Sequence, residues 1–201
     1  MIVRGFLTTL SLSVMLLGSA FSEEKAPAPD VVASTYFSKW VSGDICEGID
    51  TCWDVNRCFV DVFGEDYKKL SASDRSYLQH IFTVFMVASN KSPAVMASLK
   101  GAKVTIGGSA KLADDKVRVT AKLTTGDSVR ELFADLVKTG AGWKITNLGN
   151  GQRGLEALKP AWDQYKTARG ADATIVEWWE VMLSQIMSAK YAAPKKGESD
   201  G

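Results

Sequence analysis

The chain is poor in the residues that most enzyme active sites use. Its 201 residues include one histidine, His80, and the G-x-S-x-G pattern of a nucleophile elbow is absent. A single histidine leaves little scope for a Ser-His-Asp or Cys-His site. Carboxylate pairs such as Glu177 and Glu180 fall in predicted turns or on polar helix faces, where solvated charges are ordinary. We therefore expect a protein that is not an enzyme and that uses no cofactor.

An excess of basic charge is also missing. The chain has 24 Lys and Arg residues against 23 Asp and Glu residues, a formal net charge of +1. Proteins that bind nucleic acid need a basic patch or stripe to neutralise phosphates. No such stripe is present, so nucleic acid is not expected as a partner.

Long apolar runs are confined to the first twenty residues. Arg4 precedes the apolar stretch "FLTTLSLSVMLL", and "GSA" provides small residues for cleavage after Ala20. This pattern is typical of a secretory signal peptide and is too short for a membrane span. We expect residues 1–20 to be a cleaved signal peptide, 21–29 a disordered lead-in, 30–190 one domain and 191–201 a disordered tail. The expected location is the periplasm.

Three cysteines, Cys46, Cys52 and Cys58, follow one another at intervals of six residues. In an oxidising compartment one disulfide is expected to be stable. Cys46–Cys52 is the favoured pair, because Cys52 and Cys58 would point to different faces of a helix that ran through both. Buried thiols are the alternative. A metal site is disfavoured, because zinc ligands usually begin with a closer spacing and a fourth ligand is lacking.

The first half of the chain has the periodicity of helices. Asp30 is in position to cap a helix that ends at Gly43, and a loop with Cys46 then leads to a second helix at 52–63, stopped by Gly64. Ser71 and Asp74 form a capping-box pattern before a third helix. Its apolar stripe predicts one buried face, made by Leu78, Ile81, Phe82, Phe85 and Met86.

After Pro93 the periodicity changes to that of strands. Val117, Val119, Ala121 and Leu123 alternate strictly with polar residues, and turn residues stand at 114–115, 126–127 and 139–142. The run 132–137 is apolar at consecutive positions, yet the turns at both ends favour a strand. Connections this short join antiparallel neighbours. The sequence therefore predicts a four-stranded antiparallel meander.

A glycine motif follows the last predicted strand. Gly149, Gly151 and Gly154 spell the G-x-G-x-x-G of dinucleotide-binding turns. That turn belongs to a parallel β-α-β unit, whereas here the preceding strand closes a meander and only helices, at about 153–168 and 174–190, follow. We interpret the glycines as a flexible joint with permissive backbone angles, including positive φ.

The final predicted helix has a wide apolar stripe. It is formed by Ile175, Trp178, Trp179, Met182, Leu183, Ile186 and Met187. Core packing is the simplest interpretation. A membrane-surface helix is weakened by Glu177 and Glu180 on the polar face. The third interpretation is the wall of an apolar ligand pocket, which can form where helices cover a curved sheet.

Three stretches in this layout resemble the periplasmic phospholipid-binding family called MlaC, or toluene-tolerance protein D. They are "VFGEDYKKLSASDRSYLQHIF", "GWKITNL" and "GNGQRGLEALKPAWDQYKTARGADATIVEWW", and the resemblance spans Asp30 to Ser188. The chain departs from the family in three places. Asn147, Leu148 and Asn150 stand where the family commonly has an aromatic or acidic residue, and "LKPAW", with Pro160, stands where it has an Arg. The cysteine region is not typical of the family either. The resemblance implies a remote member with altered docking or cargo, or a direct counterpart.

The resemblance implies an α+β fold of the NTF2-like or cystatin-like kind and a monomeric phospholipid carrier. Such a carrier shields acyl chains between sheet and helices and docks transiently on inner- and outer-membrane complexes, which maintains outer-membrane lipid asymmetry. The candidate lipid-binding residues are Phe82, Phe85, Met86, Val119, Ala121, Leu123, Leu132, Leu136, Trp143, Ile145, Trp178 and Met182. A one-residue error in register would exchange Leu132 and Leu136 for Phe133 and Val137.

A ligand-free protein is the alternative. The same arrangement of sheet and helices occurs in NTF2-like adaptor modules whose cone is filled by their own side chains. The protein would then be an interaction module of the cell envelope. The surplus of large apolar residues favours a pocket.

Overall fold

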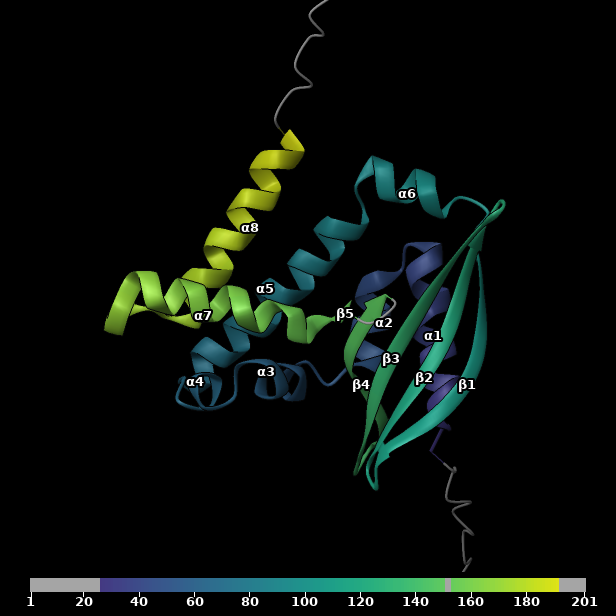
Figure 1. The fold of residues 1–201 in the computed structure, drawn as a ribbon, viewed down its shortest axis with the longest axis horizontal. Coiled ribbons are helices and arrows are strands. Elements are labelled where there is room, and N and C mark those ends of the chain that lie inside the picture. Colours follow the sequence, from purple (N-terminus) through teal and green to yellow (C-terminus); the bar gives the residue numbers. More distant parts are fainter. Residues whose placement is uncertain (1–25, 151–152, 192–201) are drawn as a thin grey trace, which may run out of the picture.

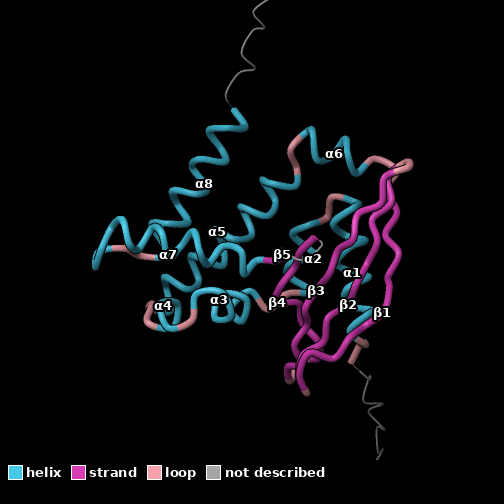
Figure 2. The backbone as a smooth tube through the Cα atoms, viewed as in Figure 1, coloured by secondary structure: helices cyan, strands magenta, loops and turns pink. Residues whose placement is uncertain are grey.

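A computed structural model describes residues 26–150 and 153–191. A five-stranded sheet with helix α1 on one face lies beside a group of helices that continues from the β4 edge (Figures 1 and 2). The predicted signal peptide, and most of the predicted lead-in and tail, fall outside the described residues. The helices are α1 (Pro29–Ser42), α2 (Ile45–Cys52), α3 (Val55–Phe63), α4 (Glu65–Lys68), α5 (Ala72–Asn90), α6 (Pro93–Leu99), α7 (Leu158–Arg169) and α8 (Ile175–Tyr191), with 3₁₀ turns η1 (Leu155–Ala157) and η2 (Gly170–Asp172).

The expected helix ends are confirmed at two places. Gly43 ends α1 in the left-handed region, with φ of 91°, which glycine adopts without the clash of a Cβ. Ser71 caps α5, and its Oγ accepts a hydrogen bond of 3.1 Å from the backbone N–H of Asp74. Asp30 is not a cap: Ala28 holds the N-cap position and Pro29 the first turn, so Asp30 lies in the first turn beside the positive end of the helix dipole.

The prediction of one helix over 52–63 behind a loop is wrong. Residues 45–52 already form α2, and the chain breaks at Trp53 and Asp54 before α3 begins. The break has a tertiary cause, because Trp53 forms a parallel bridge with Ile145 and the Asp54 N–H donates to the Ile145 carbonyl at 2.9 Å. Asp54 then caps α3 by accepting from the backbone N–H of Arg57.

The predicted meander is confirmed, with one short addition. The strands β1 (Lys103–Ala113), β2 (Lys116–Thr125), β3 (Ser128–Thr139), β4 (Gly142–Asn150) and β5 (Arg153–Gly154) pair antiparallel in sequence order. The structure is therefore an α+β fold in which an antiparallel sheet packs against flanking helices.

The register decides which face of the sheet points to the helices. Val119 pairs with Ala134 and Ala121 with Leu132, and all four belong to the hydrophobic core. Leu132 and Leu136 therefore lie on the helix-covered face, as predicted. Phe133 and Val137 are buried as well but belong to the opposite face.

The glycine motif lies in an antiparallel turn, where Gly149 pairs with Gly154 across β4 and β5. This geometry excludes the β-α-β unit of a dinucleotide site. The expectation of positive φ is wrong for both residues, since neither is in the left-handed region, and Gly151 lies outside the described residues. Gly154 leaves space for two neighbouring side chains instead: a Cβ there would come within 2.6 Å of Asn147 Oδ1, so the ends of Asn147 and Glu156 would have to shift.

The helices beyond the β4 edge meet in an aromatic core. Phe59 of α3, Phe82 of α5 and Trp179 of α8 have ring centroids 5.5 to 6.1 Å apart in edge-on or T-shaped arrangements, which aromatic pairs prefer. Trp178 and Trp179 are both buried, so core packing explains the two tryptophans of the last helix. Within the described part of the chain, no helix is long and apolar enough to cross a membrane.

Candidate functional site

A cavity of about 260 Å³ lies between α1, α5 and the end of the sheet where β3 and β4 meet η1. Its walls come from five elements, and α1, α5 and the strands are distant from one another in sequence, so the cavity exists only in the folded chain. The lining residues are Tyr36, Phe37, Trp40, Met86, Asn90, Leu132, Leu148, Gly149, Asn150 and Leu155.

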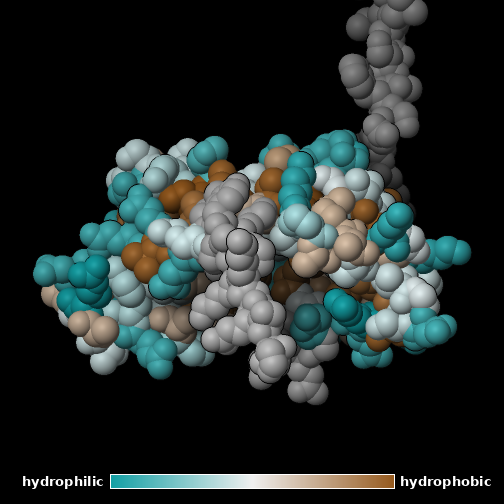
Figure 3. All heavy atoms as spheres, turned by 90° about the horizontal axis from the view of Figure 1, so that it is seen from above, coloured by the Kyte–Doolittle hydropathy of each residue, from teal (hydrophilic) through white to brown (hydrophobic). Residues whose placement is uncertain are grey.

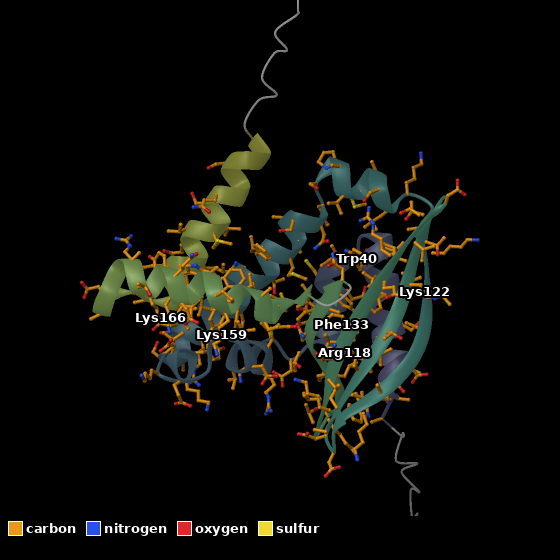
Figure 4. The ribbon with its side chains drawn as sticks, in the orientation of Figure 1. Trp40, Arg118, Lys122, Phe133, Lys159 and Lys166 are labelled. Atoms are coloured by element: carbon orange, nitrogen blue, oxygen red, sulfur yellow. The ribbon has the colours of Figure 1, made fainter. Side chains whose placement is uncertain are left out.

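The cavity has a buried inner end and a polar rim. Tyr36 and Phe37 are almost completely buried, whereas Trp40 and Asn90 are half-buried. The Trp40 indole Nε1 donates to Asn90 Oδ1 at 2.8 Å, which joins α1 to α5 across the cavity. Asn90 in turn donates from Nδ2 to the Met86 carbonyl at 2.7 Å. Figure 4 shows Trp40 in the region where α1, α5 and β5 meet.

The chemistry of the lining suits an apolar ligand. None of the described residues that line the cavity is charged, and its polar groups are the amides of Asn90 and Asn150, the Trp40 indole and the Tyr36 hydroxyl. Burial of the Tyr36 hydroxyl raises the pKa of this side chain well above its usual value, so it stays neutral. Each methylene buried here would contribute about 0.8 kcal/mol.

Two of the twelve residues predicted from the sequence, Met86 and Leu132, line this cavity. The others lie elsewhere in this structure. Phe82, Val119, Ala121, Leu123, Leu136 and Ile145 are buried in the core. Phe85 of α5 packs against Trp179 of α8, and Trp178 is buried against Phe63 and Trp162. Met182 and Trp143 are half-buried against the core. Their role as lipid ligands stays a prediction.

The part of the wall that α1 builds is not among the ligand residues predicted from the sequence. Tyr36, Phe37 and Trp40 lie on the apolar stripe of the first predicted helix. That stripe was the available signal, but periodicity does not show whether a face meets a ligand or a core. Leu148 and Leu155 were missed as well, and both flank the glycine motif.

A larger and more polar groove of about 650 Å³ lies at the other end of α5. It is bounded by the α2–α3 junction, by α5 and by the β3–β4 turn. Its lining residues are Ile49, Asp50, Trp53, Asp54, Val55, Asn56, Ser76, Gln79, His80, Thr83, Thr139, Ala141 and Lys144. Lys144 donates from Nζ to the Thr51 carbonyl at 2.6 Å, at the C-terminal end of α2. Mixed charges suit this groove to water and polar groups.

The outer face of the sheet holds a half-buried ion pair that supports the cavity wall. Arg118 donates from Nε and Nη2 to the two oxygens of Asp135, and its guanidinium lies 3.9 Å from the centre of the Phe133 ring. Figure 4 shows Arg118 and Phe133 together on β2 and β3. The hydrogen bond to Asp135 raises the pKa of Arg118, so the guanidinium stays protonated.

The same carboxylate is linked to the cavity through Asn147. Asn147 donates from Nδ2 to Asp135 at 3.0 Å and accepts from the Leu155 backbone N–H at 2.7 Å. Because Leu155 lines the cavity, the ion pair on one face of the sheet positions a wall residue on the other.

The predicted Cys46–Cys52 disulfide is wrong, since all three thiols are free. Cys46 and Cys52 lie six residues apart in one helix, which separates them by about 9 Å along its axis, beyond the reach of a disulfide. Cys46 is exposed, and burial raises the pKa of both Cys52 and Cys58. No group of three or more His, Cys, Asp and Glu side chains in the described ranges could hold a metal ion.

No protein-family model matches this chain, and no curated protein matches it. A solved structure is similar: the phospholipid-binding protein from Ralstonia solanacearum, in complex with a phospholipid. The two share 16% sequence identity over 79% of this chain and 93% of that chain, with a TM-score of 0.61. At this identity the likeness establishes the fold, an antiparallel sheet with flanking helices.

Proposed function

We propose that this protein binds phospholipid acyl chains and carries them through the periplasm between membrane complexes. The observation that supports this most directly is the uncharged cavity between α1, α5 and the β3–β4 end of the sheet. A chain in this cavity would be held by apolar area alone, with the rim amides next to its polar end.

The fold supports the same proposal. The Ralstonia solanacearum protein, which was solved with a phospholipid bound, has this arrangement of sheet and helices. The proposal also includes transport between inner- and outer-membrane complexes and a role in outer-membrane lipid asymmetry. It further includes a monomeric state and export by a signal peptide. These parts of the proposal derive from the resemblance of the sequence to the MlaC family and from the pattern of residues 1–20.

The apolar side chains on one face of the surface are scattered. Figure 3 shows apolar side chains on this face as separate patches among polar ones, outside the part that grey residues cover. The largest aromatic side chains of α8 are buried rather than exposed.

A ligand-free adaptor module is the second candidate, and one observation favours it. Eight of the twelve predicted ligand residues belong to the buried core, so most of the space between sheet and helices is filled. In that case the 260 Å³ cavity would be an incidental gap in the packing.

The two candidates differ in what the purified protein contains. We would produce the full chain with its own signal peptide in a Gram-negative host, purify it from the periplasm without detergent, and record native mass spectra followed by lipid extraction. The proposal predicts one lipid mass per folded chain. A folded protein that carries no lipid, and takes none up from vesicles, would contradict it and favour the adaptor.

A further inference from the structure

Two aromatic rings close the inner end of the cavity. Tyr36, 2% exposed, lines the cavity, and its ring packs against Trp53 at a centroid distance of 5.6 Å and an interplanar angle of 65°. Trp53, 5% exposed, lines the polar groove on its other side. Tyr36 and Trp53 therefore form a partition between the two hollow spaces.

Both spaces follow the same face of α5. Ser76, Gln79 and Thr83 line the groove, whereas Met86 and Asn90 line the cavity. Residues three or four apart are neighbours on a helix surface, so these five form one continuous row. The cavity and the groove thus lie end to end along α5. Trp53 also contacts Phe82 of α5, at a centroid distance of 5.6 Å, which fixes the partition from the helix side.

The cavity is small for a lipid. A methylene group occupies about as much space as a water molecule in the liquid, roughly 30 Å³. The 260 Å³ cavity therefore has room for about nine carbons, enough for part of one chain and too few for two long chains. A longer chain would meet Tyr36 and Trp53, and beyond them a groove lined by Asp50, Asp54 and Lys144.

We propose that the cavity takes one acyl chain, methyl end first, and that Tyr36 and Trp53 limit its inserted length to about nine or ten carbons. The polar end of the amphiphile then lies at the Asn90 and Asn150 amides. This proposal rests on the proposed function. It narrows the ligand to a single-chain amphiphile, such as a lysophospholipid or a fatty acid.

The test is a chain-length series on the wild-type protein. We would titrate lysophosphatidylcholines with six to sixteen carbons, below their micelle concentrations, by isothermal titration calorimetry. Affinity should rise about fourfold per methylene, as 0.8 kcal/mol implies, and then level off at about ten carbons. A series of fatty acids should level off at the same length, because the limit lies inside the cavity and is independent of the polar end.

Three other outcomes are distinguishable. Affinity that keeps rising to sixteen carbons would overturn the length limit. Tighter binding of a diacyl lipid than of its single-chain counterpart would overturn the single-chain proposal. Lipid binding itself would stand in both cases. The absence of binding by every lipid would instead overturn the proposed function.

A variant tests the partition directly. Trp53→Leu removes the bulk behind the Tyr36 ring and should shift the plateau toward longer chains, by as many carbons as the smaller side chain leaves room for. The control is Trp162→Leu, which removes an equally buried tryptophan from the contacts with Phe63, Tyr165 and Trp178, away from both spaces. It should leave the plateau at about ten carbons. A folded Trp53→Leu protein with an unchanged plateau would contradict the role of Trp53, and if this variant fails to fold, Trp53→Phe replaces it.

Discussion

Arg118 donates two hydrogen bonds, of 2.6 and 2.9 Å, to the carboxylate of Asp135 on the neighbouring strand. Asp135 is buried, while a third of the Arg118 side chain remains exposed. Asn147 extends this pair to the backbone of Leu155, so the ion pair fixes the point where the chain leaves the sheet for α7.

Removing the cation should therefore destabilise the fold. Arg118→Met leaves Asp135 as a buried carboxylate without its partner, which costs about 3 kcal/mol of unfolding free energy. Urea denaturation followed by tryptophan fluorescence measures it. The control is Lys116→Met on the same strand, which loses only a longer, more exposed contact of 3.5 Å to Asp61 and should cost at most about 1 kcal/mol. Equal losses in the two variants would contradict the assignment.

Filling the cavity should displace lipid without disrupting the core. Met86→Trp places a larger side chain in the 260 Å³ space, and we expect bound lipid to fall several-fold with a loss of stability of about 1–2 kcal/mol. Leu183→Trp is the matched control, because Leu183 is half-buried against the core but does not line the cavity. We would measure the lipid content by extraction and the melting temperature of both variants. Equal lipid content in both variants would place the ligand elsewhere.

The three thiols should differ in reactivity. Cys46 is exposed, whereas burial raises the pKa of Cys52 and Cys58 and keeps them protonated. Without reductant, a thiol reagent should label one cysteine in the folded protein and three in denaturant, and Cys46→Ser should abolish the fast reaction. A single reactive thiol in denaturant would show that two cysteines form a disulfide.

The Asp66 carboxylate should make the stability of the fold depend on pH in the acidic range. Lys166 and the Trp162 indole donate to Asp66 at 2.8 and 3.0 Å, and these hydrogen bonds lower the pKa of Asp66. The pKa of an Asp carboxyl in the unfolded chain is about 3.9. When the pKa in the folded protein is lower, the carboxylate stabilises the fold at pH values above about 3.9. This stabilisation is lost as the pH falls through the folded pKa.

The wild-type protein should therefore melt at a higher temperature than Asp66→Asn at neutral pH. The difference should shrink below about pH 4 and vanish once Asp66 is protonated in both states. Melting curves by circular dichroism across this range measure it. A difference that persists unchanged into strong acid would mean that Asp66 acts through packing alone.

The sheet could be predicted from the sequence because its signals are local. Strict alternation in β2 fixes the face of Val119 and Leu123, and short turns require antiparallel neighbours. The break between α2 and α3 could not be predicted, because its cause is a hydrogen bond from Asp54 to Ile145, more than ninety positions away along the chain. Helix α6 could not be predicted from the change to strand periodicity after Pro93. Pro93 is the first residue of this helix, and Ser92 caps it.

The site is harder to predict from the sequence than the fold, for a physical reason. An apolar stripe records that a face is buried, and a face that packs against a core has the same composition as one that faces a ligand. Phe82 and Met86 share the stripe of α5, yet Phe82 contacts Trp53 and Phe59 while Met86 meets the cavity. Only the positions of α1 and η1, set by tertiary contacts, distinguish the two.

The central claim is that an acyl chain lies between α1, α5 and the β3–β4 end of the sheet. It is tested most directly by photo-crosslinking the full-length protein to a phospholipid with a diazirine in its acyl chain, and by mapping the adducts with mass spectrometry. We predict adducts on the peptides that contain Met86, Leu132 and Leu148, and their loss in Met86→Trp. Adducts confined to the exposed faces of α7 and α8, or none at all, would contradict the account.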